Sequence, residues 1–192
     1  MVPSQTMFFR SPSSGMQGVR DQLWLSRQMR RIGREIGRYG WSAAPLQLPY
    51  DRAPRCIHTV GFDESLNRPE LIIFDTPPEI AFQELSFAFQ AWSRDQLEIK
   101  DGSTWFKDAG EVRCVVRKVD PSQVSSWFGL AAERRRRITG DSSGLAAFQL
   151  VLADRAGFLP WEPCYDESAG MWQPALYEPE ADAAMASGSA PT

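Results

Sequence analysis

The sequence predicts a single α+β domain, in which a mostly antiparallel β-sheet is packed by two to three helices on one face. Its 192 residues are enough for one hydrophobic core, and 43% of them are apolar. Strand-like runs are interrupted by only two or three helical stretches, an order typical of α+β proteins. The sequence shows no internal repeat.

The folded domain is expected over residues 19–177. Residues 1–18 and 178–192 are rich in small and polar residues without periodicity, so we expect a disordered arm and a disordered tail. No apolar run approaches the roughly 18–20 residues that span a bilayer, and the N-terminus lacks a signal-peptide core. We therefore predict a cytoplasmic protein with no membrane partner.

A first amphipathic helix is predicted from Asp21, its N-terminal cap, to Gly40. Its apolar residues recur at spacings of four, three and four and form a core-facing side. Gly33 and Gly37 let another backbone come close. We interpret the opposite, arginine-rich side as solvated, with an anion site as the alternative. The apolar residues are Leu25, Met29, Ile32 and Ile36, and the arginines are Arg27, Arg30, Arg31, Arg34 and Arg38.

Two strands are predicted at 41–48 and 55–62, joined by a turn at 49–54, and 70–74 forms a central strand. A second helix starts at 76–79, where Thr76 caps it and Glu79 completes a capping box. One side of this helix is expected to be buried. Its residues are Ala81, Leu85, Ala88 and Trp92, with Phe82 and Phe89 beside them.

The second half of the domain adds three strands and one helix. The Asp101-Gly102 turn leads into a strand through Phe106, and 111–119 forms the next strand. A third helix opens at Pro121 and continues to the arginines at 134–137. The last core strand covers 148–153.

Two motif-dense segments carry a family resemblance. The first reads His58-Thr59-Val60-Gly61-Phe62 and continues as Arg68-Pro69-Glu70-Leu71; the second runs from Phe148 to Pro163, followed by Gln173-Pro174. Over about residues 38–176 the chain resembles a bacterial family catalogued as a domain of unknown function, number 4262. The resemblance implies a compact α+β domain and no particular activity. It also implies an aromatic residue, usually Tyr, at position 58 and a His at position 68, where this chain has His58 and Arg68.

We expect the two segments to meet, because the strand at 71–74 needs an apolar neighbour and 148–152 is the best match. Such pairing would form a shallow cleft with His58 at its base. The candidate ligand-binding residues are His58, Arg68, Glu70, Trp161 and Glu162.

Each candidate has a structural alternative. His58 is either a general base or a half-buried histidine with one hydrogen bond. Glu70 can cap amides, pair with Arg68, or act as a base with a raised pKa. The Trp161 side chain either packs over the sheet as part of the core or lines a ligand-binding site. Asp154 is explained by the turn that it opens.

Four consecutive arginines follow the third predicted helix: Arg134, Arg135, Arg136 and Arg137. We interpret them either as a solvated helix end or as contacts for an anion or a partner protein. The cysteines Cys56, Cys114 and Cys164 have no paired spacing, so we expect reduced, mostly buried thiols, no metal and no cofactor.

We therefore expect a small binding or accessory module for a small molecule or a protein. A hydrolase or transferase using His58 and Glu70 is the first alternative. An interaction protein that uses its arginines for an acidic or nucleic-acid partner is the second. We do not expect nucleic acid, because a net charge of −3 argues against a footprint over the whole surface.

Overall fold

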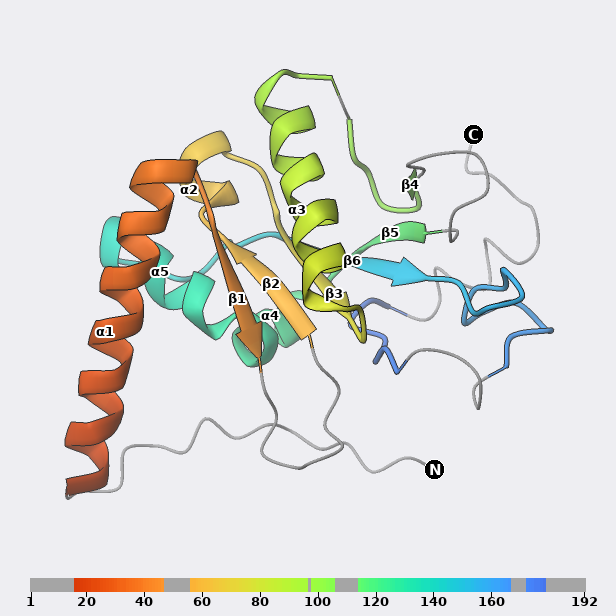
Figure 1. Ribbon diagram of the computed structural model, residues 1–192. Coiled ribbons are helices and arrows are strands. Elements are labelled where there is room, and N and C mark those ends of the chain that lie inside the picture. The colour runs from red at the N-terminus through yellow and green to blue at the C-terminus, as the bar shows by residue number, and fades with distance from the viewer. Residues whose placement is uncertain (1–15, 47–55, 97, 106–113, 167–171, 179–192) are drawn as a thin grey trace.

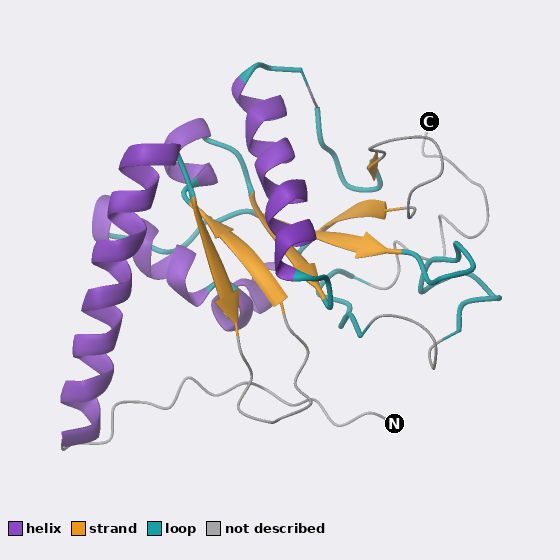
Figure 2. Cartoon of the chain, viewed as in Figure 1, coloured by secondary structure: helices purple, strands orange, loops and turns teal. Residues whose placement is uncertain are grey.

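The computed structural model describes residues 16–46, 56–96, 98–105, 114–166 and 172–178. Within them, a six-stranded mixed sheet lies between helices on both sides (Figure 1, Figure 2). This confirms the predicted α+β domain. The strands are β1 (Ser42–Leu46), β2 (Cys56–Val60), β3 (Glu70–Phe74), β4 (Thr104–Trp105), β5 (Cys114–Lys118) and β6 (Ala147–Leu152). The helices are α1 (Met16–Tyr39), α2 (Phe62–Leu66), α3 (Pro78–Ser93), α4 (Pro121–Trp127) and α5 (Gly129–Thr139).

The sheet has the order β1-β2-β3-β6-β5-β4, and its neighbouring strands are antiparallel except for β3 and β6. The parallel pair aligns Glu70 with Ala147 and Ile73 with Leu150, so the two motif segments do pair as predicted. Because β3 lies inside the sheet and is buried along its whole length, its sequence is almost entirely apolar.

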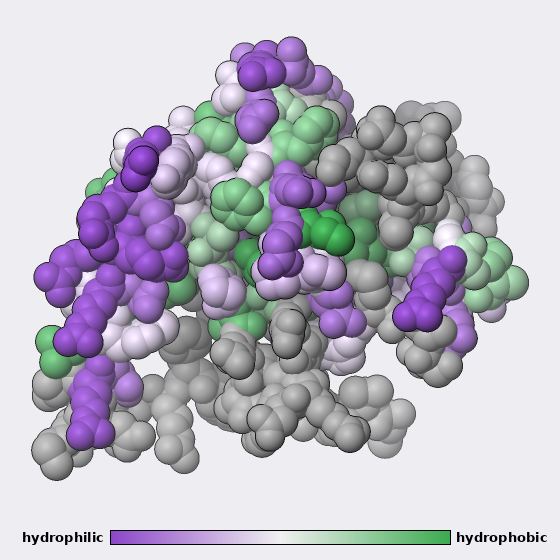
Figure 3. All heavy atoms as spheres, viewed as in Figure 1, coloured by the Kyte–Doolittle hydropathy of each residue, from purple (hydrophilic) through white to green (hydrophobic). Residues whose placement is uncertain are grey.

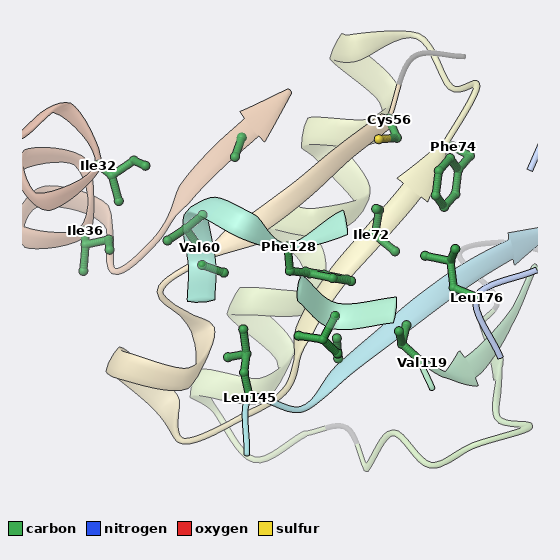
Figure 4. Close-up of a cluster of buried hydrophobic side chains, with 14 of the residues drawn as sticks. Ile32, Ile36, Cys56, Val60, Ile72, Phe74, Val119, Phe128, Leu145 and Leu176 are labelled. Atoms are coloured by element: carbon green, nitrogen blue, oxygen red, sulfur yellow. The ribbon is translucent and has the colours of Figure 1, made fainter. Parts of the chain in front are cut away.

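Helices cover both faces of the sheet, so the predicted one-sided packing is wrong. α3 packs on one face through Ala81, Leu85, Ala88 and Trp92, the side expected from the sequence. On the other face, α1 and the α4–α5 turn contribute the second apolar cluster (Figure 4). Successive strand residues point to opposite faces, so a sheet with buried central strands needs a cover on each side.

Several helix boundaries differ from the prediction. α1 begins at Met16, so Asp21 is not its cap. Pro77 occupies the N-cap position of α3, and Thr76 donates its hydroxyl hydrogen to the Phe74 carbonyl instead of forming a capping box. α2 lies between β2 and β3, where no helix was predicted. The rest of the predicted arm and tail, the turn at 49–54, Phe106 and residues 111–113 lie outside the described residues.

The predicted third helix is two helices that meet at Phe128. This residue ends α4 with a backbone φ of −116° and ψ of 31°, and it also precedes α5. Its side chain is fully buried in the core on the α1 side of the sheet. Gly129 follows directly, and its low helix propensity makes the break inexpensive.

Candidate functional site

A pocket of about 760 Å³ lies between α1, the β1–β2 edge of the sheet and the α4–α5 turn; we call it the α1–α5 pocket. Its volume falls within the roughly 300–1,000 Å³ that small-molecule sites occupy. The apolar part of its wall combines leucines from three elements with two tryptophans, one of which is Trp24 of α1. The other residues of this wall are Leu25, Leu46, Leu130 and Trp127.

His58 borders this pocket from the middle of β2. It pairs with Ala44 on one side and Ile72 on the other, which places its side chain on the same sheet face as the core of Figure 4. Phe128 packs on it edge to face, with ring centroids 5.4 Å apart. The break between α4 and α5 therefore builds this site, because it turns Phe128 down onto the imidazole.

The imidazole of His58 is only 2% exposed, and neither ring nitrogen has a hydrogen-bond partner among the described residues. Burial lowers its pKa from 6.5 to about 4, so the ring is neutral at neutral pH. A neutral imidazole offers one donor and one acceptor, and leaving such a group unpaired costs about 1–3 kcal/mol. This differs from the expected half-buried histidine with one hydrogen bond.

The charged side chains around the pocket pair with one another. Arg31 donates to the Glu35 carboxylate at 3.0 Å, and Arg136 donates to Glu133 at 2.8 Å. The pocket therefore combines apolar walls and one unsatisfied buried ring with a rim whose charges are already neutralised.

Glu70 is buried at a second position, where it organises the first motif segment. Its carboxylate accepts hydrogen bonds from the Thr59 hydroxyl at 2.5 Å, from the Gly61 amide at 2.8 Å and from the Asp63 amide at 3.2 Å. Burial outweighs these bonds and raises its pKa from 4.5 to about 6. Glu70 thus caps neighbouring amides, one of its three expected roles.

Gly61 makes this arrangement possible. Its φ of +112° belongs to the left-handed region, and a Cβ atom there would lie 2.9 Å from the Ile36 side chain. The glycine lets α2 turn back over β3, so that its first amides reach Glu70. The Phe62 side chain then enters the core between Trp41 and Trp92, and its ring centroid lies 5.6 Å from that of each tryptophan.

The other candidates lie apart from these two positions. Arg68 pairs with Asp95 at 3.2 Å rather than with Glu70. The Trp161 ring packs against the buried guanidinium of Arg117 at 5.2 Å and edge to face on Tyr177. Glu162 accepts a hydrogen bond from the Leu159 amide, which makes it part of its own turn.

These candidates do not line one common pocket among the two described here. Glu70 borders a smaller pocket of about 250 Å³, His58 borders the α1–α5 pocket, and Trp161 borders neither. The parallel pairing gives the reason. Glu70 stands at the start of β3, whereas the chain that leads to Trp161 leaves the far end of β6.

The second motif segment is a turn built on Asp154. Its carboxylate accepts hydrogen bonds from the amides of Ala156, Phe158 and Asp166, and these bonds lower its pKa. Gly157 completes the turn with a φ of +90°. The predicted turn role of Asp154 is confirmed.

All four arginines at 134–137 pair with carboxylates. Arg134 bonds Glu64 through two nitrogens at 2.8 Å, and Arg135 bonds Asp63. Arg136 and Arg137 share Glu133. The cluster therefore ties α5 to α2 and to itself.

The three cysteines are unpaired thiols. Cys56 and Cys114 are buried, which raises their pKa values, that of Cys56 to about 12, and Cys164 is exposed. No group of three or more His, Cys, Asp or Glu side chains gathers at metal-binding range within the described ranges. In the same part of the chain, no helix is both long and apolar enough to cross a membrane.

The fold and pockets define a single-domain α+β protein with a buried imidazole beside an apolar pocket. A family model for a domain of unknown function, DUF4262, matches residues 35–166, and the chain belongs to this family. No curated protein and no solved structure matches the chain.

Most of the pocket wall was missed by reasoning from the sequence. Trp127, Phe128 and Gly129 were placed inside one helix, although the glycine after two aromatics signalled a break. Leu46 and Leu130 carried no signal, because single leucines do not distinguish a pocket wall from a core.

Proposed function

We propose that this protein is a binding module that takes a small, neutral, largely apolar molecule into the α1–α5 pocket. One polar group of the ligand forms a hydrogen bond with His58. The observation that most supports this is the buried imidazole without a partner among the described residues, beside a pocket of small-molecule size.

The surroundings favour a neutral ligand. A charged ligand would compete with the Arg31–Glu35 and Arg136–Glu133 pairs, which already satisfy the rim. The aromatic surface of Trp127 and the leucine walls favour a flat, apolar body. A ring flip exchanges the nitrogens and carbons of His58, so the imidazole can present either polar position to the ligand.

Binding has more support than the hydrolase or transferase alternative. A histidine with a pKa of about 4 is a weak base at neutral pH. The carboxylate of Glu70 is held by Thr59 and two amides and does not orient the imidazole. These contacts suit a recognition role for His58 and a structural role for Glu70.

Nuclear magnetic resonance tests the proposal directly, because His58 is the only histidine and gives one set of imidazole signals. Protein with ¹⁵N-labelled histidine is titrated with indole, a flat neutral probe with one N–H donor. We expect saturable shifts of the ring nitrogens with a Kd of about 0.1–1 mM, the range for so small a ligand.

Two variants and a control make the result specific. His58→Leu removes the anchor, and its indole binding is followed by backbone amide shifts. Ala132→Phe fills the pocket, whereas Ala175→Phe adds the same ring at an exposed site outside it. The first two changes should weaken binding at least tenfold and the third should not. Equal binding by all variants, or no ring shift in the wild type, would reject the site.

A further inference from the structure

We propose that the outer side of α1 is a docking surface for an acidic segment of a partner protein. α1 contains six arginines and two acidic residues, a surplus of four positive charges, whereas the whole chain has a net charge of −3. The rest of the chain is thus negative, and positive charge is concentrated on one helix.

The arginines of α1 form a row on its solvent side. At about 100° per residue, Arg20, Arg27, Arg34 and Arg38 fall within about 40° of one another, and the row spans about 27 Å. The buried Met29, Ile32 and Ile36 lie on the opposite side. Figure 3 shows hydrophilic residues along α1 on the face in view. We call these four residues the α1 arginine row.

The α1 arginine row differs from the arginines of α5 in its partners. Each of the four α5 arginines pairs with a carboxylate. In the α1 row, no residue has a carboxylate partner within the described part of the chain; Arg38 instead lies over the Tyr39 ring. Like charges four residues apart, such as Arg34 and Arg38, destabilise a helix, and an acidic partner would relieve that repulsion.

Exposed apolar side chains flank the row. Leu23 is 53% exposed, Trp24 54% and Tyr39 57%. Arginine, tryptophan and tyrosine are the residues that carry most binding energy in protein interfaces. The guanidinium fork also fits carboxylates with two parallel bonds, as the Arg134–Glu64 pair shows in this protein.

An acidic protein segment fits the charge distribution better than a nucleic acid does. A short acidic helix touches only α1, where the positive charge is. A long polyanion would also approach the surrounding surface, whose net charge is negative. The side of α1 that could enter a bilayer is buried against the sheet, which argues against a membrane.

Fluorescence anisotropy with a synthetic probe tests the proposal. The probe is a labelled peptide of about 20 residues with glutamate at every third or fourth position, the spacing of neighbours on a helix. Its control has glutamine at those positions. We expect the acidic peptide to bind with micromolar affinity that weakens as salt rises, and the glutamine peptide not to bind.

A matched pair of double variants locates the surface. Arg27→Gln with Arg34→Gln should weaken binding at least tenfold. Arg94→Gln with Arg155→Gln removes the same charge from exposed positions outside α1 and should change it less than threefold. Thermal melts confirm that both variants fold.

Three results would overturn the proposal. The acidic peptide binds no better than the glutamine peptide, or both double variants lose binding equally. Alternatively, an oligonucleotide or an anionic vesicle of phosphatidylserine binds more tightly than the peptide through the same arginines, which would assign the surface to that class.

Discussion

The unsatisfied imidazole of His58 leads to a prediction about stability. Replacing His58 with Leu keeps a side chain of similar size and removes two buried nitrogens that have no partner among the described residues. Removing an unsatisfied buried polar group recovers about 1–3 kcal/mol. At pH 7.5 and without ligand, His58→Leu should therefore increase the free energy of unfolding by that amount, measured by urea denaturation.

The pH dependence gives a sharper form of the same prediction. The pKa of His58 is about 4 in the folded protein and 6.5 in the unfolded chain. Below pH 6.5, protons therefore bind preferentially to the unfolded chain. The stability that depends on a neutral His58 is fully present above pH 6.5 and is lost as pH falls toward 4. Linkage puts the loss at about 2 kcal/mol by pH 5 and about 3 kcal/mol by pH 4.

The comparison between wild type and variant isolates this effect, because the chain has one histidine and both proteins share every other titrating group. The stability gap between His58→Leu and the wild type should widen by about 2 kcal/mol from pH 7.5 to pH 5. A gap that stays constant, or a variant less stable at both pH values, would show that His58 has a partner or is solvated, and the reasoning would be wrong.

Four further predictions follow from the same contacts. Gly61→Ala should destabilise the fold by about 2–4 kcal/mol in urea, because it combines a φ of +112° with a close contact to Ile36; Gly37→Ala, with no heavy atom near its added Cβ, is the matched control. The stability of the wild type relative to Glu70→Gln should rise by about 1.6 kcal/mol as pH falls from 7 to 4.5, because protons bind Glu70 more readily in the folded state, with a pKa of about 6, than in the unfolded state; a difference that does not change with pH would contradict the burial of Glu70. Deleting residues 1–15 and 179–192 should leave the melting temperature nearly unchanged, and a drop of many degrees would show that an end docks on the domain. EDTA and a thiol reductant should not shift thermal unfolding, and stoichiometric zinc released on denaturation would refute this.

The fold was largely predictable because its signals are local. The spacing of Met29, Ile32 and Ile36 defines one side of a helix, and the apolar run at 70–74 defines a central strand. The number of layers was not predictable, because a strand buried on both faces does not reveal what covers each face. The break at Phe128 was also missed, because burial of one aromatic ring overrides the helical pattern on either side.

The candidate site was predictable only in part. His58 was found because a lone histidine in an apolar strand is conspicuous, but its missing hydrogen bonds depend on the distant Phe128 and on the strands around it. Trp161 was placed with Glu70 on the correct assumption that β3 and β6 pair. The direction of that pairing decides which loops meet, and the sequence did not contain it.

The residues of the two motif segments mostly hold the fold together. Thr59, Gly61 and Glu70 fix α2 against β3, and Asp154 closes the turn after β6. His58 is different, because its side chain bonds to no described residue. The resemblance implies an aromatic residue, usually Tyr, at this position, and tyrosine and histidine both place a hydrogen-bonding group at the end of an apolar body. A tyrosine reaches further than a histidine, so the residue at position 58 would set the depth of the α1–α5 pocket and the polar group that meets the ligand. In the proposed binding role, the hydrogen-bonded motif residues fix the fold, and His58, whose ring bonds to no described residue, sets the ligand preference.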